Sequence, residues 1–244
     1  MADGFIEEVD ALKRAWEELG STRPFWSVLT KDRYLPENIT DSDKEFFYSS
    51  MFEMVDFLTP EFEHVGHSLT PGKDVRVLDF GCGLGRLSFG FASRGFETVG
   101  VDISNPHVEI AREWNDKKLK LDNVKFEIIE PGAPIPHGPF DFAFSVIVLQ
   151  HNRPTIMKAC IGRIIDALKP GGAAMLHIPY EIEGYDESIL LTPPVSMEMH
   201  FLPIDEIIQL ATEHGGSVVR IEGANRCGAR IKNAHFYIEK NATH

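Results

Sequence analysis

The sequence of 244 residues has only three cysteines, Cys82, Cys160 and Cys227. They are odd in number and widely spaced, and no two of them form a Cys-x-x-Cys pair. This pattern argues against a disulfide framework and against a zinc site built on cysteine. We therefore expect a cytoplasmic protein, because free cysteines are typical of a reducing compartment.

Long apolar runs are also lacking. No apolar segment approaches the roughly 20 residues that a membrane-spanning helix needs. The first residues, Met1–Glu8, do not show the basic and then apolar order of a signal peptide. We expect neither a membrane span nor a secretory leader.

Positive charge is scarce as well. The chain has 24 Lys and Arg residues against 37 Asp and Glu residues, which gives a formal net charge of −13. Proteins that bind nucleic acid concentrate Lys and Arg in order to displace counterions from phosphates. No basic cluster of that kind occurs in the sequence, so we expect no nucleic-acid partner. An acidic surface mainly supports solubility.

The most informative feature that is present is the stretch Val75–Ser88. It begins as a buried strand pattern, continues through glycines at positions 81, 83 and 85, and then enters an amphipathic helix. Glycine adopts backbone torsions that are closed to other residues, and it leaves room for a ligand beside the main chain. The stretch therefore predicts a ligand-binding turn between a strand and a helix.

The spacing of these glycines separates two classes of cofactor site. A dinucleotide fingerprint reads G-x-G-x-x-G, whereas this loop reads Gly81-x-Gly83-x-Gly85 with Asp79 two residues before it. The pattern resembles the class I S-adenosylmethionine-dependent methyltransferases of the small-molecule type. The resemblance implies that the loop wraps the aminoacyl end of S-adenosylmethionine.

Two further acids stand where this family places cofactor contacts. Asp102 closes a short predicted strand, Glu97–Asp102, at the position of the acid that accepts hydrogen bonds from both ribose hydroxyls. Glu130 follows the predicted strand Val124–Ile129, where the family usually has an Asp that contacts the adenine amine. The chain departs from the pattern at Pro131-Gly132, where most relatives begin a short helical turn.

The resemblance continues to about residue 180. The segment Phe140–His151 matches the fourth strand and the Leu-Gln-His that many of these enzymes have after it, and the Ser145–Val146 backbone would border the cofactor. The turn Leu168–Gly172 then leads into a fifth strand, Ala173–Ile178. The cofactor-binding residues that follow from the resemblance are Asp79, Phe80, Gly81, Cys82, Gly83, Gly85, Asp102, Ile103, Glu130, Ser145 and Val146.

Structural alternatives exist for these residues. The glycines by themselves fit an ordinary strand-to-helix turn, since short motifs produce false matches. Asp102 also fits an acid at the N-terminus of the helix that begins near Asn105. The two roles of Asp102 are compatible.

The alternation of strands and helices predicts an α/β fold with a doubly wound, Rossmann-like, mostly parallel sheet of seven strands. The last two predicted strands, Ser217–Glu222 and Asn233–Glu239, would form the antiparallel hairpin that the resemblance implies at one sheet edge. The first strand starts near Val75. The predicted helices between and after the strands lie near residues 84–93, 105–117, 154–168 and 203–214.

A helical extension precedes this sheet. Residues 5–19 have helical spacing of apolar residues and end at Gly20, residues 21–40 show no period, and residues 41–58 form a second predicted helix. The apolar face of the first helix consists of Phe5, Ile6, Val9, Leu12, Trp16 and Leu19. We predict an extension and lid over residues 1–70, packed on a methyltransferase domain over residues 71–244.

The acceptor molecule should bind beyond the carboxyl ends of the strands. Three segments reach that edge: Arg23–Thr30, the turn after the fourth strand, and the long loop Pro179–Leu202. Their aromatic and polar side chains suit a lid and a pocket. We expect Trp26 and Tyr180 to bind the acceptor, although Trp26 also fits a buried anchor for the N-terminal helix.

Methyl transfer depends mostly on alignment and on exclusion of water. A base is needed only when the nucleophile must lose a proton. His151 is the first candidate and His200 the second, while His151 also fits a simple role at the start of the next helix. No cluster of carboxylates and amides follows the fourth strand, so we expect transfer without a metal ion.

The sequence therefore predicts S-adenosylmethionine-dependent methylation of a small-molecule acceptor, with O-methylation of a sugar derivative or secondary metabolite favoured. N- or C-methylation of a small metabolite is the first alternative. A nicotinamide-dependent oxidoreductase would need the other glycine spacing, and a non-catalytic S-adenosylmethionine-binding module would lose the cofactor acids. The oligomeric state is left open.

Overall fold

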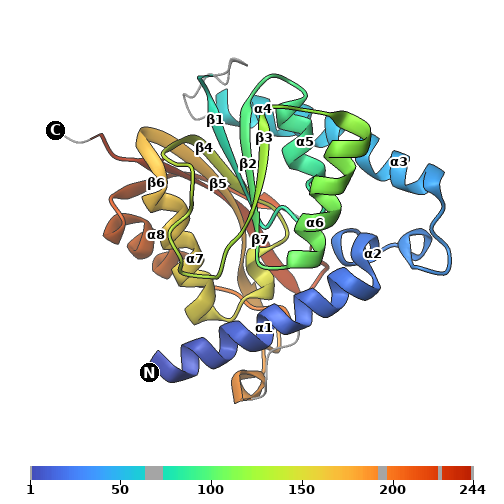
Figure 1. Cartoon of the computed structure of the whole chain (residues 1–244). Coiled ribbons are helices and arrows are strands. Elements are labelled where there is room, and N and C mark those ends of the chain that lie inside the picture. The colour runs from blue at the N-terminus through green and yellow to red at the C-terminus, as the bar shows by residue number, and fades with distance from the viewer. Residues whose placement is uncertain (1, 64–73, 192–196, 225–226, 243–244) are drawn as a thin grey trace. The chain divides into compact units, whose positions relative to one another are not determined.

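The structure is a computed structural model that describes residues 2–63, 74–191, 197–224 and 227–242 (Figure 1). The chain forms two compact units. One comprises residues 16–129, and the other comprises residues 1–15 together with residues 130–244. The predicted domain boundary between residues 70 and 71 lies outside the described residues and stays a prediction.

The strands form a seven-stranded sheet in the order β3-β2-β1-β4-β5-β7-β6. The pairs β1–β2, β2–β3 and β4–β5 are parallel, and β7 is antiparallel to both β5 and β6. The predicted doubly wound sheet with an antiparallel edge hairpin is confirmed. The strand order reverses between β1 and β4, and open α/β sheets bind ligands beyond the carboxyl ends of the strands at such a reversal.

The unit of residues 16–129 contains β1 (Arg76–Phe80), β2 (Glu97–Asp102) and β3 (Val124–Ile128). Helices α5 (Arg86–Ala92) and α6 (Asn105–Trp114) contact these strands. Strands β1 and β2 are buried along nearly their whole length, as expected for parallel strands that are covered on both faces. A π-helical turn, η2 (Asn115–Leu119), extends α6.

The other unit contains the second half of the sheet. Its helices α7 (Pro154–Asp166) and α8 (Ile204–Glu213) pack against each other and against strands of the same unit (Figure 1). The large apolar residues of α7 are buried. The strands are β4 (Phe140–Ser145), β5 (Leu168–Ile182), β6 (Gly216–Ala224) and β7 (Ile231–Lys240), and the short helices are η3 (Leu149–His151) and η4 (Glu187–Leu191).

The first helix, α1 (Ala2–Thr22), is longer than predicted. The helix continues past Gly20 to Thr22. The glycine is needed here for a close approach of the helix to a neighbouring side chain, and it does not end the helix. A Cβ atom at Gly20 would lie 2.7 Å from Nδ1 of His107. The predicted apolar face is correct for Val9 and Leu12, which are buried, but wrong for Ile6, which is exposed.

Two predictions for residues 21–58 are wrong in detail. Residues 21–40 contain the short helices α2 (Pro24–Val28) and η1 (Asp32–Tyr34). The predicted single helix over residues 41–58 is divided at Ser50 into α3 (Asp41–Ser49) and α4 (Met51–Glu63). The Ser50 hydroxyl donates to the carbonyl oxygen of Phe47, and such side-chain bonds to the backbone compete with helix continuation.

Strand β5 also differs from its prediction. It begins at Leu168 and thus includes the segment that was predicted as a turn, with an irregular register opposite Phe140 and Phe142 of β4. Gly172 allows this close pairing, because a Cβ atom there would lie 2.9 Å from the carbonyl oxygen of Phe140. The strand then runs past the predicted end at Ile178 as far as Ile182.

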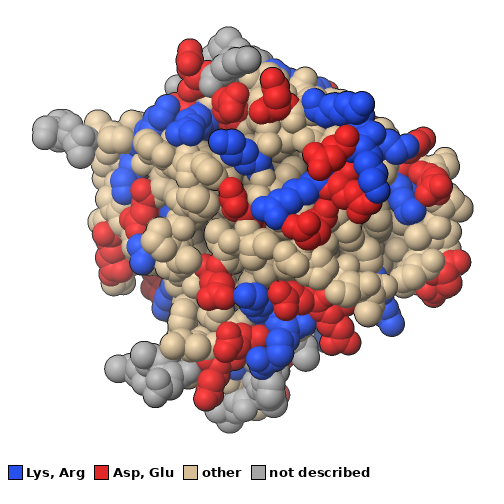
Figure 2. Space-filling view, in the orientation of Figure 1, with Lys and Arg blue, Asp and Glu red and all other residues tan. Residues whose placement is uncertain are grey.

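The surface carries mixed charge on the face that Figure 2 shows, where acidic and basic side chains are interspersed. Several of them are paired, for example Lys158 with Glu206 and Arg112 with Glu109. None of the helices in the described parts of the chain is long and apolar enough to cross a membrane.

Candidate functional site

The glycine loop after β1 has the backbone conformation that the sequence predicts. Gly81, Gly83 and Gly85 have φ values of 78°, 51° and 75°, which are left-handed and favour glycine. The N–H groups of Gly81 and Cys82 both donate to the carbonyl oxygen of Val101, at 2.8 and 3.0 Å. These bonds fix the start of the loop to the neighbouring strand β2.

Close packing around the loop explains two of the glycines further. A Cβ atom at Gly85 would lie 2.6 Å from Cζ of Phe126, and one at Gly83 would lie 3.0 Å from Cγ2 of Val28. Val28 ends α2, so the predicted lid segment Arg23–Thr30 does lie against the glycine loop.

Asp102 joins the end of β2 to this loop. Its Oδ2 accepts the N–H of Gly83 at 2.8 Å, and its Oδ1 accepts the N–H of Ser104 at 2.9 Å. Ser104 precedes α6, so Asp102 also serves the helix N-terminus, as its alternative interpretation proposed. Each carboxylate oxygen can accept a second hydrogen bond, which leaves acceptor capacity for hydroxyl donors.

Asp79 lies in a different environment at the end of β1. Its side chain is buried and accepts one hydrogen bond, from the Ser88 hydroxyl at 2.6 Å. Burial away from water raises the pKa of Asp79 to about 7, and the nearby charge of Asp102 adds to this effect. The cofactor-free protein therefore contains a carboxyl group that titrates near neutral pH.

The other predicted residues of this loop are shielded by the same packing. Phe80 and Cys82 are buried, and Ile103 is half-buried. Burial raises the pKa of the Cys82 thiol well above its usual value, and the charges of Asp102 and Asp79 add to this effect. Cys82 is therefore a packed, protonated thiol and not a nucleophile.

Trp26 lies half-buried in α2. It packs against an aromatic cluster that includes Phe25, Tyr34 and Phe47. The guanidinium of Arg23 lies over its ring, 5.8 Å from the ring centre. These contacts fit the anchor interpretation of Trp26, while its partial exposure leaves the role in acceptor binding as a prediction.

Three predicted cofactor residues belong to the other unit. Glu130 is half-exposed, and its carboxylate pairs with Nζ of Lys13 at 3.0 Å. Ser145, the last residue of β4, is buried, and Val146 is half-buried. Their roles toward the cofactor remain predictions, and an adenine contact by Glu130 would replace its ion pair with Lys13.

His151 lies in the turn after β4. Its Nδ1 lies 3.0 Å from the carbonyl oxygen of Glu198, which can only accept, so Nδ1 carries the proton. In the neutral ring the lone pair is then on Nε2. Burial lowers the pKa of His151, and repulsion by a charged His200 adds to this effect. The ring of His151 is therefore held by the loop that contains Glu198, and its role at the start of α7 stays a prediction.

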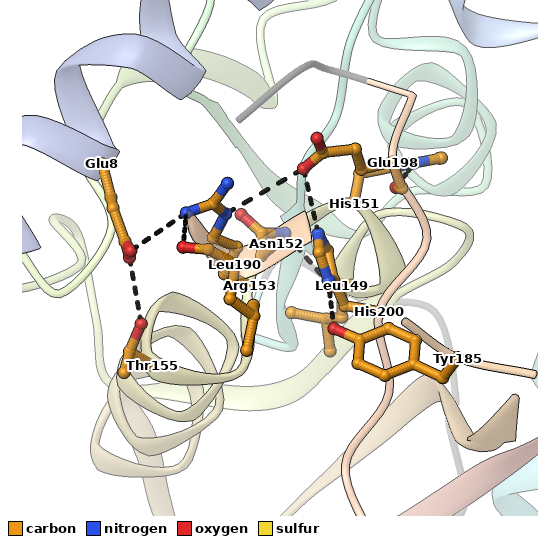
Figure 3. Close-up of polar contacts among 10 residues, drawn as sticks. All are labelled: Glu8, Leu149, His151, Asn152, Arg153, Thr155, Tyr185, Leu190, Glu198 and His200. Carbon is orange, nitrogen blue, oxygen red and sulfur yellow. Dashed lines mark hydrogen bonds and ion pairs between the residues drawn. The ribbon is translucent and has the colours of Figure 1, made fainter. Parts of the chain in front are cut away.

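His200 is completely buried, and both of its ring nitrogens have partners within the same loop. Nε2 lies 3.3 Å from the Glu198 carboxylate, and Nδ1 lies 2.8 Å from the Tyr185 hydroxyl (Figure 3). Because a carboxylate only accepts, Nε2 donates and Nδ1 accepts the Tyr185 proton. Burial lowers the pKa of His200. In its predicted catalytic role, His200 would therefore take up a proton by way of the Tyr185 hydroxyl.

Arg153 is a buried cation that sequence analysis missed. Figure 3 shows it between Glu8 of α1, at 3.2 Å, and Glu198, at 4.0 Å, and it also donates to the carbonyl oxygen of Leu190 at 2.8 Å. The acids lie far from Arg153 along the chain, and no local spacing indicates the pairing. Arg153 connects α1, the turn after β4 and the loop after β5.

Tyr180 lies half-buried in β5 at an irregularity of the β5–β7 register, between Pro179 and Glu181. Such irregularities re-aim a side chain next to a functional site. Its predicted contact with the acceptor stays a prediction.

Cys82 and Cys160 are buried free thiols. Among the described residues, no group of three or more His, Cys, Asp or Glu side chains is placed to hold a metal ion.

The glycine loop follows the carboxyl end of β1, and this is the edge at which open α/β sheets bind their ligands. The family model described as "Methyltransferase domain" matches residues 71–192. The chain therefore belongs to this methyltransferase family, which has the class I fold and uses S-adenosylmethionine.

Curated relatives match part of the chain. A ubiquinone biosynthesis O-methyltransferase of Dechloromonas aromatica (strain RCB) is 36% identical over 104 residues, which are 41% of this chain and 43% of that protein. A sterol 4-C-methyltransferase of Caenorhabditis elegans is 26% identical over 165 residues, or 58% of this chain and 48% of that protein. The matched region thus spans only about half the length of these relatives.

A solved structure shares the fold over nearly the whole chain. It is a magnesium protoporphyrin IX methyltransferase from Synechocystis PCC 6803 with bound SAH, which is 19% identical with a TM-score of 0.67. The similarity covers 96% of this chain and 100% of that chain.

Proposed function

We propose that this protein transfers the methyl group of S-adenosylmethionine to a hydroxyl oxygen of a small molecule, such as a sugar derivative or secondary metabolite. One observation carries the proposal. Asp102, which we propose binds the ribose, accepts the N–H of Gly83 and so contacts the left-handed glycine loop directly. Family membership supplies the chemical class.

The residues of this loop fit the cofactor. Asp102 retains lone pairs for two hydroxyl donors, and the left-handed glycines leave main-chain atoms accessible beside β1. Asp79 adds a carboxyl group that a cationic ligand would ionise. We propose that these residues hold S-adenosylmethionine together with Phe80, Gly81, Cys82, Gly85, Ile103, Glu130, Ser145 and Val146.

The bound cofactor supplies an activated methyl group, and the chain must position the acceptor and remove its proton. We propose that Nε2 of His151 takes the proton of the acceptor hydroxyl. Because Nδ1–H donates to Glu198, the ring orientation and the tautomer are already set. The lowered pKa keeps the ring neutral at neutral pH, so it is ready to accept a proton.

The preference for oxygen rests on this histidine, because a hydroxyl must lose its proton to a base as the methyl group is transferred, whereas a neutral amine attacks through its lone pair. The relatives include enzymes named as O- and 4-C-methyltransferases, so N- or C-methylation is the second candidate. We also propose a cytoplasmic protein without a nucleic-acid partner, on the basis of the odd number and wide spacing of the cysteines and the excess of Asp and Glu over Lys and Arg.

The proposal is tested by incubating the protein with S-adenosylmethionine that carries a labelled methyl group and with a panel of hydroxylated small molecules. Label should appear in a hydroxylated product by mass spectrometry, with release of S-adenosylhomocysteine. Label only in amines or on carbon would replace the oxygen assignment, and no transfer to any member would contradict the proposal for this panel.

The histidine is tested by His151→Asn, with His137→Asn as control. His137 is exposed and has a left-handed φ of 64°, which asparagine tolerates. We expect His151→Asn to lower kcat by about 100-fold, the usual contribution of general base catalysis. Unchanged kcat in His151→Asn would remove His151 from the reaction.

A further inference from the structure

The turn after β4 contains a buried amide, the side chain of Gln150, that has no partner in the part of the chain that the structure describes. Gln150 is 1% exposed, and neither its Oε1 nor its Nε2 has a hydrogen-bond partner among the described residues. A buried amide without hydrogen bonds costs free energy, and such groups are uncommon in native proteins. Packing alone therefore does not explain why an amide side chain is buried at position 150.

The neighbouring polar side chains of the same turn each have at least one partner. His151 bonds to the carbonyl oxygen of Glu198, Asn152 donates to that of Val148, and Arg153 pairs with Glu8. Figure 3 shows the side chains of His151, Asn152 and Arg153 with Glu8 and Glu198. The lack of a partner is thus specific to Gln150 and is not a general property of the segment.

The position of Gln150 places it among acceptor-binding segments. It follows β4, whose carboxyl end lies where the strand order reverses. Its own carbonyl oxygen accepts the N–H of His200 at 2.8 Å, which fastens the loop after β5 to this turn. The amide lies directly before His151 in the chain.

We propose that the Gln150 side chain recognises the acceptor molecule by hydrogen bonds and so determines its specificity. This inference rests on the proposed function and deepens it. A primary amide offers both donors and an acceptor but no charge. It suits a neutral group with both capacities, such as a hydroxyl or a hydroxyl beside a carbonyl.

The surrounding charges support a neutral acceptor. In this unit the Arg153 guanidinium is opposed by the carboxylates of Glu8 and Glu198. Burial lowers the pKa of His151 and of His200, so both rings are neutral near neutral pH. The single positive charge of Arg153 therefore faces the two negative charges of Glu8 and Glu198. An anionic acceptor would therefore meet uncompensated negative charge.

The first test compares the thermal stability of the cofactor-free protein in two buried amide variants. Gln150→Met removes a buried amide without partners. It should raise the Tm by at least about 2 °C, because the folded protein no longer carries the free-energy cost of burying an unpaired amide. Asn152→Leu is the matched control. It removes an amide that bonds to Val148, at 3.0 Å, and should lower the Tm.

The second test observes the Gln150 side-chain N–H signals by NMR, assigned through their loss in Gln150→Met or Gln150→Glu. Phenol, N-methylacetamide and benzoate are titrated into the protein with and without saturating S-adenosylhomocysteine. We expect the signals to shift with the two neutral probes and to shift at least tenfold less with benzoate.

A fall of the Tm in Gln150→Met would overturn the proposal, because the amide would then have a structural partner. Absence of any shift with the neutral probes, or an equal response to benzoate, would overturn it as well. Failure of S-adenosylhomocysteine to bind contradicts the proposed function instead. In that case the titration without it still decides whether Gln150 binds a neutral molecule.

Discussion

Asp79 and Asp102 end adjacent parallel strands, yet their surroundings differ. Asp102 accepts two backbone N–H groups, whereas Asp79 accepts one hydroxyl in a site shielded from water. Backbone donors favour a charged carboxylate, and burial disfavours it. At the residue scale, Asp102 is therefore suited to accept hydrogen bonds from neutral hydroxyl groups. Asp79 is suited to lose its proton when a cation binds nearby.

The raised pKa of Asp79 predicts a pH dependence of stability. Between about pH 4 and pH 7 the folded protein keeps a proton on Asp79 that the unfolded chain has lost, so this residue makes stability fall as the pH rises. Asp79→Asn removes this effect. The variant should match the wild type at pH 4 and exceed it by about 4 kcal/mol at pH 8, since the folded and unfolded pKa values differ by about 3 and each pKa unit is worth about 1.4 kcal/mol.

Urea denaturation of both cofactor-free proteins at the two pH values measures this difference. Equal stability at pH 8 would show that the Asp79 pKa is not raised. The same variant should bind S-adenosylmethionine more weakly than the wild type, because the ionised carboxyl is lost.

We expect substitution of Asp102 to lower the affinity for the cofactor. Asp102→Asn keeps the size of the side chain but replaces one acceptor oxygen with a donor. Loss of charge-assisted bonds should weaken S-adenosylhomocysteine binding by about 30-fold or more, as measured by calorimetry. Asp122→Asn, at an exposed position, is the control. Equal affinity in both variants would remove Asp102 from the cofactor site.

At the scale of elements, Arg153 connects three segments that are distant in the chain. Its side chain is only 4% exposed, and its partners lie on α1 and on the loop after β5. A buried ion pair is costly to break because the remaining charges lose compensation. This residue therefore determines how firmly α1 and the loop are held within their unit.

Arg153→Met should lower the free energy of unfolding by about 3 kcal/mol. The control is Lys158→Met, whose exposed ion pair with Glu206 is worth less than about 1 kcal/mol. Chemical denaturation monitored by circular dichroism compares the two variants. An equally small effect in both would mean that Arg153 does not support these segments.

The sequence predicted the strands and the glycine loop well, because buried parallel strands and left-handed glycines leave strong local patterns. It failed where a tertiary contact decided the outcome. Gly20 was taken as a helix end, yet it makes room for His107. Ser50 divides a helix whose apolar spacing continues across it, through a hydroxyl bond that the apolar pattern does not contain.

The same limit applies to the candidate site. Asp79, Asp102 and the glycines belong to a motif with fixed spacing and could be predicted. The partners of Arg153 and His151 come from α1 and from the loop after β5, and the sequence has no spacing that relates them. The unsatisfied amide of Gln150 becomes visible only when the hydrogen bonds of its neighbours are known.

At the scale of the whole molecule, a cofactor that binds only the folded protein must stabilise it. At a concentration of 100 times its Kd, a ligand adds about 2.7 kcal/mol to the free energy of unfolding. For a chain of this size that corresponds to a rise of about 5–10 °C in Tm. We expect this rise with S-adenosylhomocysteine in a thermal denaturation experiment, and a flat response would contradict folded-state binding.

The central claim is that the glycine loop and its acids bind S-adenosylmethionine rather than a dinucleotide. Isothermal titration of the purified protein with S-adenosylmethionine, S-adenosylhomocysteine and NAD in parallel tests it most directly. We expect micromolar binding of the first two and no binding of NAD. Binding of NAD alone, or of none of the three, would contradict it.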